Sequence, residues 1–316
     1  MSSKTCVLIG APVDSGKARR GCLMGPDAFR VAGLPDALSE LGHTVEDLGN
    51  LVPDPQSAEG EAFLPHLHAP EETIGWTQAI SRAGRAGFSR GVPVFLGGDH
   101  ALSLGSLLAA SDHAAAENRP LFVLWLDAHT DFHTPQSTQS GNLHGTPLGY
   151  ATGRTGFARF PPVSHPVPTE NICFLGLRSV DPDERQALEQ TGARRYDMRA
   201  IDEQGIARPL SAFLDEIARA GGVLHVSLDV DFLDPGFAPA VGTTVPGGAT
   251  IREAHLVMEM ICDSGLMTSL DLVELNPFLD DRGRTAQVMV DLAASAMGRR
   301  VFDRPTPAYS PEGRFG

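Results

Sequence analysis

The sequence is poor in cysteine and in positive charge, and it contains no long apolar run. Its four cysteines are scattered and form no Cys-x-x-Cys pair, so we expect reduced thiols rather than a disulfide framework. The amino-terminal residues show no signal-peptide pattern, and no stretch approaches the ~20 apolar residues that a membrane span requires. From these absences we expect a cytoplasmic protein with no membrane partner.

Positive side chains are outnumbered, with 25 Lys and Arg against 39 Asp and Glu and a formal net charge of −14. This balance argues against a nucleic acid or an anionic membrane surface as partner. It is compatible with a small cationic substrate, although an acidic surface can also serve solubility alone. No linker divides the 316 residues, so we expect one domain over residues 1–316.

Short apolar runs alternate with segments of helical periodicity along the chain. The predicted strands cover residues 5–10, 44–48, 93–96, 121–126, 171–175, 223–228 and 267–273. The predicted helices cover residues 25–41, 71–90, 101–117, 183–191, 209–220, 250–264 and 287–297. This alternation predicts a three-layer α/β/α fold around a mostly parallel central sheet of about eight strands.

Ionisable side chains follow the most apolar of the predicted strands. Residues 121–131 read LFVLWLDAHTD, which places Asp127, His129 and Asp131 directly after a buried run. In an extended segment alternate side chains share a face, so we expect these three to point the same way. Buried carboxylates that converge need a cation between them, and a metal ion is the simplest one.

Two further clusters follow predicted strand ends. His100 closes a Gly-Gly-Asp-His segment, and Asp229 and Asp231 form an Asp-Val-Asp segment. Taken alone, the Gly-Gly-Asp-His segment could be a tight turn capped by Asp99. The Asp-Val-Asp segment could be the solvent-exposed beginning of a loop. Because ligands of open α/β sheets bind at the carboxyl ends of the strands, we expect all three clusters to meet in one crevice.

The combined set offers four carboxylates and two imidazoles. That is too many ligands for one structural zinc ion, whose sites are usually four-coordinate and rich in thiolate. Two divalent ions sharing carboxylates would satisfy the set, and oxygen-rich ligation with some imidazole suits Mn(II). The candidate metal ligands are His100, Asp127, His129, Asp131, Asp229 and Asp231.

At these residues the chain resembles the ureohydrolase superfamily and, within it, the arginases. The matching motifs occur in the family's order from about residue 5 to about residue 298. They are IGAP and RRGCLMGPDAFR near the start, GGDH (97–100), DAHTD (127–131), SGNLHG (140–145), GLRSVDPDE (176–184), SLDVDFLDP (227–235), APAVGTTVPGG (238–248) and the segment at Glu274.

The resemblance implies two Mn(II) ions per chain and assigns their ligands. The first ion would be held by His100, Asp127, Asp131 and Asp229, and the second by His129, Asp127, Asp229 and Asp231. Asp127 and Asp229 would bridge the two ions. Asp131 would also orient a bridging hydroxide, which attacks the substrate carbon.

The resemblance also assigns residues to the substrate's guanidinium end. His144 matches a proton-shuttling histidine, Glu274 matches the carboxylate that pairs with the guanidinium, and Thr243 matches a hydroxyl near it. A guanidinium is planar and stays cationic, so a bidentate carboxylate suits it. The alternatives are that His144 is a structural loop histidine and that Glu274 is a capping or supporting acid.

For the amino-acid end of the substrate, the resemblance implies one group around the α-carboxylate and another around the α-amino group. The first comprises His133, Thr138, Ser140 and Asn142, and the second comprises Asp181 and Glu184. His133 stands where the familiar animal arginases carry Asn, although imidazole can also donate to a carboxylate. Asp181 has an alternative role as a salt-bridge partner of Arg178.

The implied function is hydrolysis of L-arginine to L-ornithine and urea by an arginase-type hydrolase. The alternative within the superfamily is an amidinohydrolase acting on agmatine, a guanidino acid or an N-modified arginine. Two other possibilities are a non-catalytic relative that binds a ligand and a mononuclear zinc deacetylase of a distantly related fold. The resemblance also implies a homo-oligomer, a trimer or a hexamer.

Overall fold

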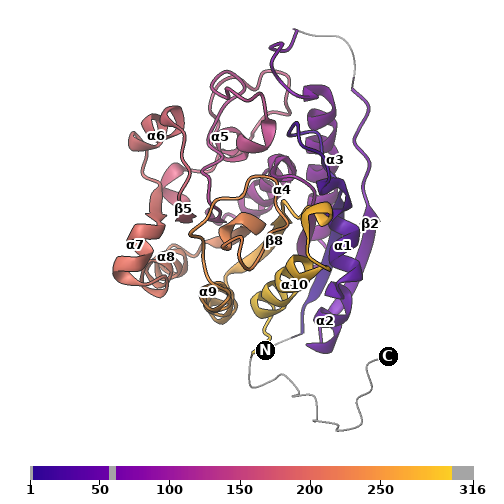
Figure 1. Cartoon of the computed structure of the whole chain (residues 1–316), viewed down its shortest axis with the longest axis vertical. Helices are drawn as coiled ribbons and strands as arrows, with labels where there is room; N and C mark the ends of the chain where they lie inside the picture. Colours follow the sequence, from indigo (N-terminus) through magenta and orange to yellow (C-terminus); the bar gives the residue numbers. More distant parts are fainter. Residues whose placement is uncertain (1–2, 57–61, 301–316) are drawn as a thin grey trace.

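The protein is built on one eight-stranded sheet in the order β2-β1-β3-β8-β7-β4-β5-β6 (Figure 1). The computed structural model describes residues 3–56 and 62–300. The strands are β1 (Thr5–Ala11), β2 (Thr44–Asn50), β3 (Val92–Gly97), β4 (Leu121–Leu126), β5 (Ile172–Leu177), β6 (Arg194–Asp197), β7 (Val223–Asp229) and β8 (Met267–Val273). Every neighbouring pair in the sheet is parallel, so the predicted parallel α/β sheet is confirmed.

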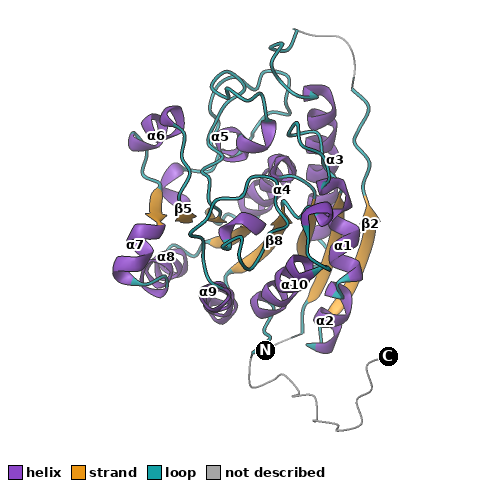
Figure 2. Ribbon diagram, in the orientation of Figure 1, coloured by secondary structure: helices purple, strands orange, loops and turns teal. Residues whose placement is uncertain are grey.

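Helices cover both faces of the sheet, which makes the predicted three layers (Figure 2). One face is covered by α1 (Gly25–Val31), α2 (Leu34–Glu40), α7 (Met198–Gln204), α8 (Ala207–Arg219), α9 (Ile251–Ser264) and α10 (Arg284–Ala296). The other is covered by α3 (Pro70–Phe88), α4 (Ser103–Ala116), α5 (Pro147–Ala151) and α6 (Pro182–Glu189).

The two cores follow from the alternation of side chains along each strand. Leu8 and Leu124 pack into the core on the α9 and α10 side, whereas their neighbours Ile9 and Trp125 pack on the α3 and α4 side. A strand buried on both faces therefore reads as a continuous apolar run, which is why the central strands were predictable.

Some predicted elements need correction. The helix expected over residues 25–41 is two helices, because Gly33 adopts φ 90° and Pro35 lies in the first turn of α2. The sequence reading also missed β6 and α7. β6 is a short edge strand of four residues with the charged sequence RRYD, so it has no apolar run to reveal it.

No helix within residues 3–56 and 62–300 has the length and apolarity needed to cross a membrane. The tail after Phe302, expected to be irregular, lies outside the described residues. The strands β3, β8, β7 and β4 are consecutive neighbours in the middle of the sheet. Because they are parallel, their carboxyl ends emerge together at one edge, and the candidate residues follow those ends.

Candidate active site

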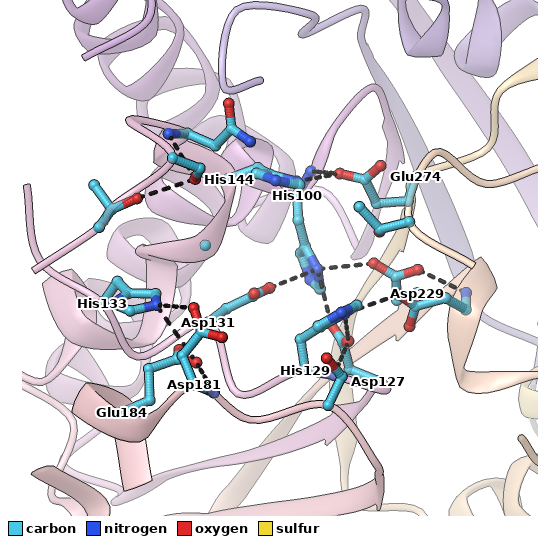
Figure 3. Close-up of a pocket in the computed structure, with 17 residues that line it drawn as sticks. His100, Asp127, His129, Asp131, His133, His144, Asp181, Glu184, Asp229 and Glu274 are labelled. Carbon is cyan, nitrogen blue, oxygen red and sulfur yellow. Dashed lines mark hydrogen bonds and ion pairs between the residues drawn. The ribbon is translucent and has the colours of Figure 1, made fainter. Parts of the chain in front are cut away.

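The candidate residues predicted from the sequence all line a single cavity of about 280 Å³ at the carboxyl edge of the sheet (Figure 3). It is lined by His100, Asp127, His129, Asp131, His133, Thr138, Ser140, Asn142, His144, Asp181, Glu184, Asp229, Asp231, Thr243 and Glu274, together with Gly145 and Ser179. Segments more than 100 positions apart therefore contribute to one site, as the topology of the sheet requires.

The loop after β3 presents His100 to the cavity. Asp99 accepts the Ala101 N–H (3.0 Å) and caps the short 3₁₀ turn that begins at His100, as expected for a turn-capping aspartate. Gly98 is required by close packing, since a Cβ there would lie 2.3 Å from the carbonyl oxygen of Val13. The loop is thus both capped and tightly packed.

The segment after β4 does not continue as a strand. β4 ends at Leu126, and Asp131 has φ +43°, a left-handed conformation that costs a non-glycine residue about 1 kcal/mol or more. The expectation of an extended segment is therefore wrong at Asp131. The turn directs the Asp131 carboxylate back toward His100, with Oδ2 3.0 Å from Nδ1.

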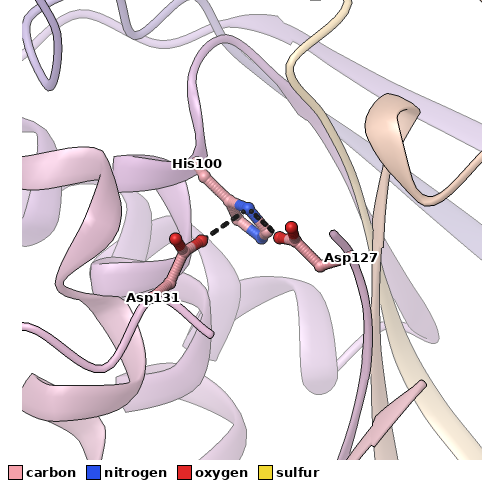
Figure 4. A group of neighbouring side chains, drawn as sticks. All are labelled: His100, Asp127 and Asp131. Atoms are coloured by element: carbon pink, nitrogen blue, oxygen red, sulfur yellow. Dashed lines mark ion pairs between the residues drawn. The ribbon is translucent and has the colours of Figure 1, made fainter. Parts of the chain in front are cut away.

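His100 forms the centre of a first acid–imidazole group (Figure 4). Its Nδ1 lies 3.1 Å from Asp127 Oδ2, 3.0 Å from Asp131 Oδ2 and 3.1 Å from Asp229 Oδ2. Its Nε2 contacts Ser227 Oγ at 2.8 Å. If Nε2 donates to that hydroxyl, the tautomer leaves the Nδ1 lone pair facing the carboxylates.

His129 forms a second group beside the first. Its Nδ1 lies 3.0 Å from Asp231 Oδ2 and 3.4 Å from Asp127 Oδ1. Asp127 thus turns one oxygen toward His129 and the other toward His100. Asp229 is less symmetric, because its Oδ1 accepts the Asp231 N–H at 2.7 Å while its Oδ2 faces His100.

The chemistry of these donors fits divalent metal ions. His100 Nδ1, Asp127 Oδ2 and Asp231 Oδ2 are buried and make no well-aligned hydrogen bond, although His100 Nδ1 lies 3.1 Å from Asp127 Oδ2 and His129 Nδ1 lies 3.0 Å from Asp231 Oδ2. Leaving three such atoms unsatisfied would be costly, whereas a cation between them would use their lone pairs. The groups His100–Asp127–Asp131 and Asp127–His129–Asp231 each place one ligand atom per residue within 4.8 Å of the others.

Protonation states at the site depend on burial and on neighbouring charge. Burial, together with the charge of Asp127, raises the pKa of Asp131 to about 6. For His129, burial disfavours the charged imidazole, but Asp231 and Asp127 outweigh it and raise the pKa to about 12. When no metal ion is bound, protons on Asp131 and His129 therefore offset the negative charge of the neighbouring carboxylates.

A third group lies at the other end of the cavity. His133 Nε2 lies 3.1 Å from Asp181 Oδ2 and 3.6 Å from Glu184 Oε2, and its Nδ1 contacts Ser137 Oγ at 3.0 Å. Asp181 and Glu184 also form the capping box of α6. His133 therefore faces the acids expected around the α-amino group.

The suggested pairing of Asp181 with Arg178 is not found. Arg178 instead donates to backbone carbonyl oxygens, including those of Val245 and Gly176 at 3.0 Å each. The polar loop between β4 and α5 contributes Thr138, Ser140 and Asn142 to the cavity lining. Within it, Thr138 Oγ1 lies 3.3 Å from Ser140 Oγ.

Glu274 follows β8 and is buried at the cavity wall. Its Oε1 lies 2.9 Å from both the His100 backbone nitrogen, whose N–H it accepts, and His144 Nδ1. Its Oε2 forms an ion pair with Lys17 Nζ. Burial alone would raise the pKa of Glu274, but Lys17 and His144 hold it well below its usual range.

The sequence reading singled out neither Lys17 nor Cys22, whose thiol lies 3.0 Å from Lys17 Nζ. Cys22 belongs to the RRGCLMGPDAFR motif, whereas Lys17 lies between that motif and IGAP, in a segment that carries no recognised pattern. No local pattern marks Lys17 as functional, since its partner Glu274 is 257 positions away. Only proximity in the fold reveals the pair.

Sequence comparison with known families matches residues 4–298 to the arginase family. The chain is 56% identical over 309 residues to the arginase of Agrobacterium fabrum, covering 97% of this chain and 94% of that protein. The chain belongs to the arginase family. It is also 57% identical over 307 residues to the arginase of Brucella melitensis, covering 96% of this chain and 99% of that one.

Solved structures agree with this membership of the arginase family. The arginase of Bacillus caldovelox superimposes with a TM-score of 0.86 at 34% sequence identity, covering 94% of this chain and 99% of that one. The predicted arginase-like fold and the family resemblance are thereby confirmed. Membership of the arginase family also removes the reading of the chain as a deacetylase of a distantly related fold.

Proposed function

We propose that this protein hydrolyses L-arginine to L-ornithine and urea at a binuclear manganese site. The observation that carries the proposal is the pair of acid–imidazole groups sharing Asp127 in one cavity with Glu274. Its membership of the arginase family, at 56% identity to an arginase over nearly the whole chain, supports the same activity.

The proposed metal ligands are the six acidic and imidazole side chains of the two groups. One Mn(II) would be held by His100, Asp127, Asp131 and Asp229, and the other by His129, Asp127, Asp229 and Asp231. Oxygen-rich ligation with imidazole supports manganese over softer metals. When bound, such ions lower the pKa of water and so supply hydroxide near neutral pH.

The remaining residues are proposed to hold the substrate along the cavity. Glu274 pairs with the guanidinium beside Thr243, so that the central carbon lies next to the metal-binding carboxylates. Thr138, Ser140 and Asn142 donate toward the α-carboxylate, with His133, and Asp181 and Glu184 accept from the α-amino group. The acidic lining supports a cationic substrate.

His144 is proposed to deliver the proton that the departing amine needs. Burial disfavours its charged form, but the charge of Glu274 outweighs this and raises the pKa of His144 above its ordinary value. A larger share of this imidazole is therefore protonated at a given pH than of a free histidine, which suits a general acid. Asp131 would orient the water that the Mn(II) ions activate when they are bound.

The direct test is urea release from a panel of guanidino compounds by protein reconstituted with Mn(II). We expect kcat/KM for L-arginine to exceed that for agmatine and for guanidino acids. A higher value for agmatine would replace the arginase assignment with an agmatine-directed amidinohydrolase. Absence of urea from every compound would favour the non-catalytic, ligand-binding alternative.

We predict that His133→Ala raises KM for arginine about ten times more than KM for agmatine. Loss of the contacts of His133 with Asp181 and Glu184 affects both substrates through their amino groups. Agmatine lacks the α-carboxylate, so the lost hydrogen bond to that charged group adds about 1.5 kcal/mol for arginine only. The measurement is steady-state kinetics on both substrates. His165→Ala, a histidine of an exposed loop, is the control and should change neither KM. Equal effects on both substrates would show that His133 does not face the carboxylate.

We also predict that affinity for Mn(II) falls as the pH is lowered. Neighbouring carboxylates raise the pKa of both His100 and His129, so each ion must displace the proton of its own imidazole, and the affinity of each site should fall about tenfold per pH unit near neutrality. Below about pH 6 Asp131 also takes a proton, so the slope should steepen. Calorimetry in two buffers with different ionisation enthalpies counts the released protons. Affinity that does not change with pH would contradict the proposed ligands.

Four broader proposals do not depend on particular side-chain contacts. We infer that residues 1–316 form a single domain, and the continuous central sheet supports this. A homo-oligomer, as a trimer or a hexamer, and a cytoplasmic location are carried over from the family. An acidic net charge of −14 supports the absence of a nucleic-acid partner.

A further inference from the structure

A buried lysine faces the carboxylate that is proposed to receive the guanidinium. The side chains of Lys17 and Glu274 are 3% and 2% exposed, and they form an ion pair through Lys17 Nζ and Glu274 Oε2. Lys17 Nζ also lies 3.0 Å from the Cys22 thiol. Breaking a buried pair leaves an uncompensated charge, so this contact is strongly held.

The backbone around Lys17 is attached to the active-site loops on both sides. Gly16 N–H donates to Asp99 Oδ2 at 2.8 Å, and Ala18 N–H donates to Asn142 Oδ1 at 3.1 Å. The Gly16 carbonyl accepts the His144 N–H at 2.9 Å. The loop is therefore anchored to segments that line the cavity, which holds the ammonium group of Lys17 beside Glu274.

Glu274 has little acceptor capacity left for a further cation. A carboxylate offers about four lone-pair positions on two oxygens. Oε1 already receives the His100 N–H and contacts His144 Nδ1, each at 2.9 Å, while Oε2 is paired with Lys17. A guanidinium that binds in a bidentate manner needs both oxygens, so it must compete with a cation already present.

We propose that Lys17 sets the affinity of the guanidinium subsite by competing with the substrate for Glu274. The inference rests on the proposed function, because it takes Glu274 as the partner of the guanidinium. Without substrate, Lys17 neutralises a buried carboxylate. On binding, the substrate places a second cation beside Lys17 and meets like-charge repulsion, which weakens every guanidino ligand regardless of its other end.

The test is substitution of Lys17 in the Mn(II)-loaded protein. Lys17→Gln should lower KM for both L-arginine and agmatine by roughly tenfold, because a buried like charge is removed. Calorimetry with methylguanidinium chloride should show a matching gain in affinity that does not depend on turnover. Lys17→Arg keeps a cation beside Glu274 and should show no such gain in affinity.

Arg20→Gln is the matched control, since it removes one positive charge from an exposed residue of the same loop. It should leave KM and methylguanidinium affinity unchanged. If Lys17→Gln does not fold, Lys17→Met takes its place in both measurements, because Met keeps the apolar part of the lysine side chain. Unchanged or weaker methylguanidinium binding in a folded Lys17 variant would overturn the inference, as would an equal gain in Arg20→Gln. Absence of urea release by the wild-type protein would overturn the proposed function instead, and the binding comparison would still decide the role of Lys17.

Discussion

Asp127→Asn should reduce urea release to below about one ten-thousandth of the wild-type rate, a loss typical of removing a catalytic group. Among the six candidate ligands, all of which lie in the described part of the chain, Asp127 alone places separate oxygens near both imidazoles, at 3.1 Å from His100 Nδ1 and 3.4 Å from His129 Nδ1. An amide keeps the shape but removes the negative charge that both proposed ions share. The loss should therefore extend to both metal positions.

Metal analysis and urea release, measured on the same sample, check this prediction. We expect fewer manganese ions per chain in Asp127→Asn than in the wild-type protein. Asp183→Asn is a suitable control, because it removes one exposed carboxylate from the first turn of α6 and should keep metal and activity. Wild-type activity in Asp127→Asn would refute the assignment of Asp127 as a shared ligand.

His144→Asn should reduce kcat by about two to four orders of magnitude while the metal content stays near that of wild type. The reason is its position: His144 Nδ1 lies 2.9 Å from Glu274 Oε1, and His144 belongs to neither acid–imidazole group. Asn can keep a hydrogen bond to Glu274 but cannot deliver a proton in the neutral pH range. The proposed general acid would be lost without disturbing the metal ligands.

Added imidazole offers a sharper readout for this variant. If His144 transfers protons, free imidazole should restore part of the kcat of His144→Asn and should do little for Asp127→Asn. Loss of manganese from His144→Asn would instead identify His144 as a ligand. A kcat close to that of wild type would leave it as the structural loop histidine considered as the alternative.

The predictable parts of the fold were those with strong local patterns. β4 and β7 are buried along their whole length and therefore read as continuous apolar runs. β6 carries charged residues at an edge, and α7 spans only seven residues, so neither produced a clear signal. The break between α1 and α2 depends on the left-handed backbone at Gly33. The spacing of apolar residues does not reveal such a backbone conformation.

The candidate site shows the same division. The six candidate metal ligands and Glu274 could be predicted to meet because they follow strand ends, and parallel strands bring those ends together. The roles of His133, His144, Asp181 and Glu184 came from the family resemblance alone. The orientation of the metal ligands could not be predicted, since Asp131 reaches His100 through a left-handed turn rather than an extended segment. The contact of His133 with Asp181 and Glu184 was likewise unforeseen, because it joins a loop to the start of a helix.

The sequence by itself determined the parallel α/β architecture, the donor atoms available for metal ions and the family to which the chain belongs. These depend on residue type and on patterns within short windows, where apolar period and ligand chemistry can be read directly. Only the tertiary structure decided which oxygen of Asp127 faces which imidazole. It alone also decided that Lys17 forms an ion pair with Glu274. Such pairings join side chains up to 257 positions apart, and no local rule of chain geometry relates them before the sheet has formed.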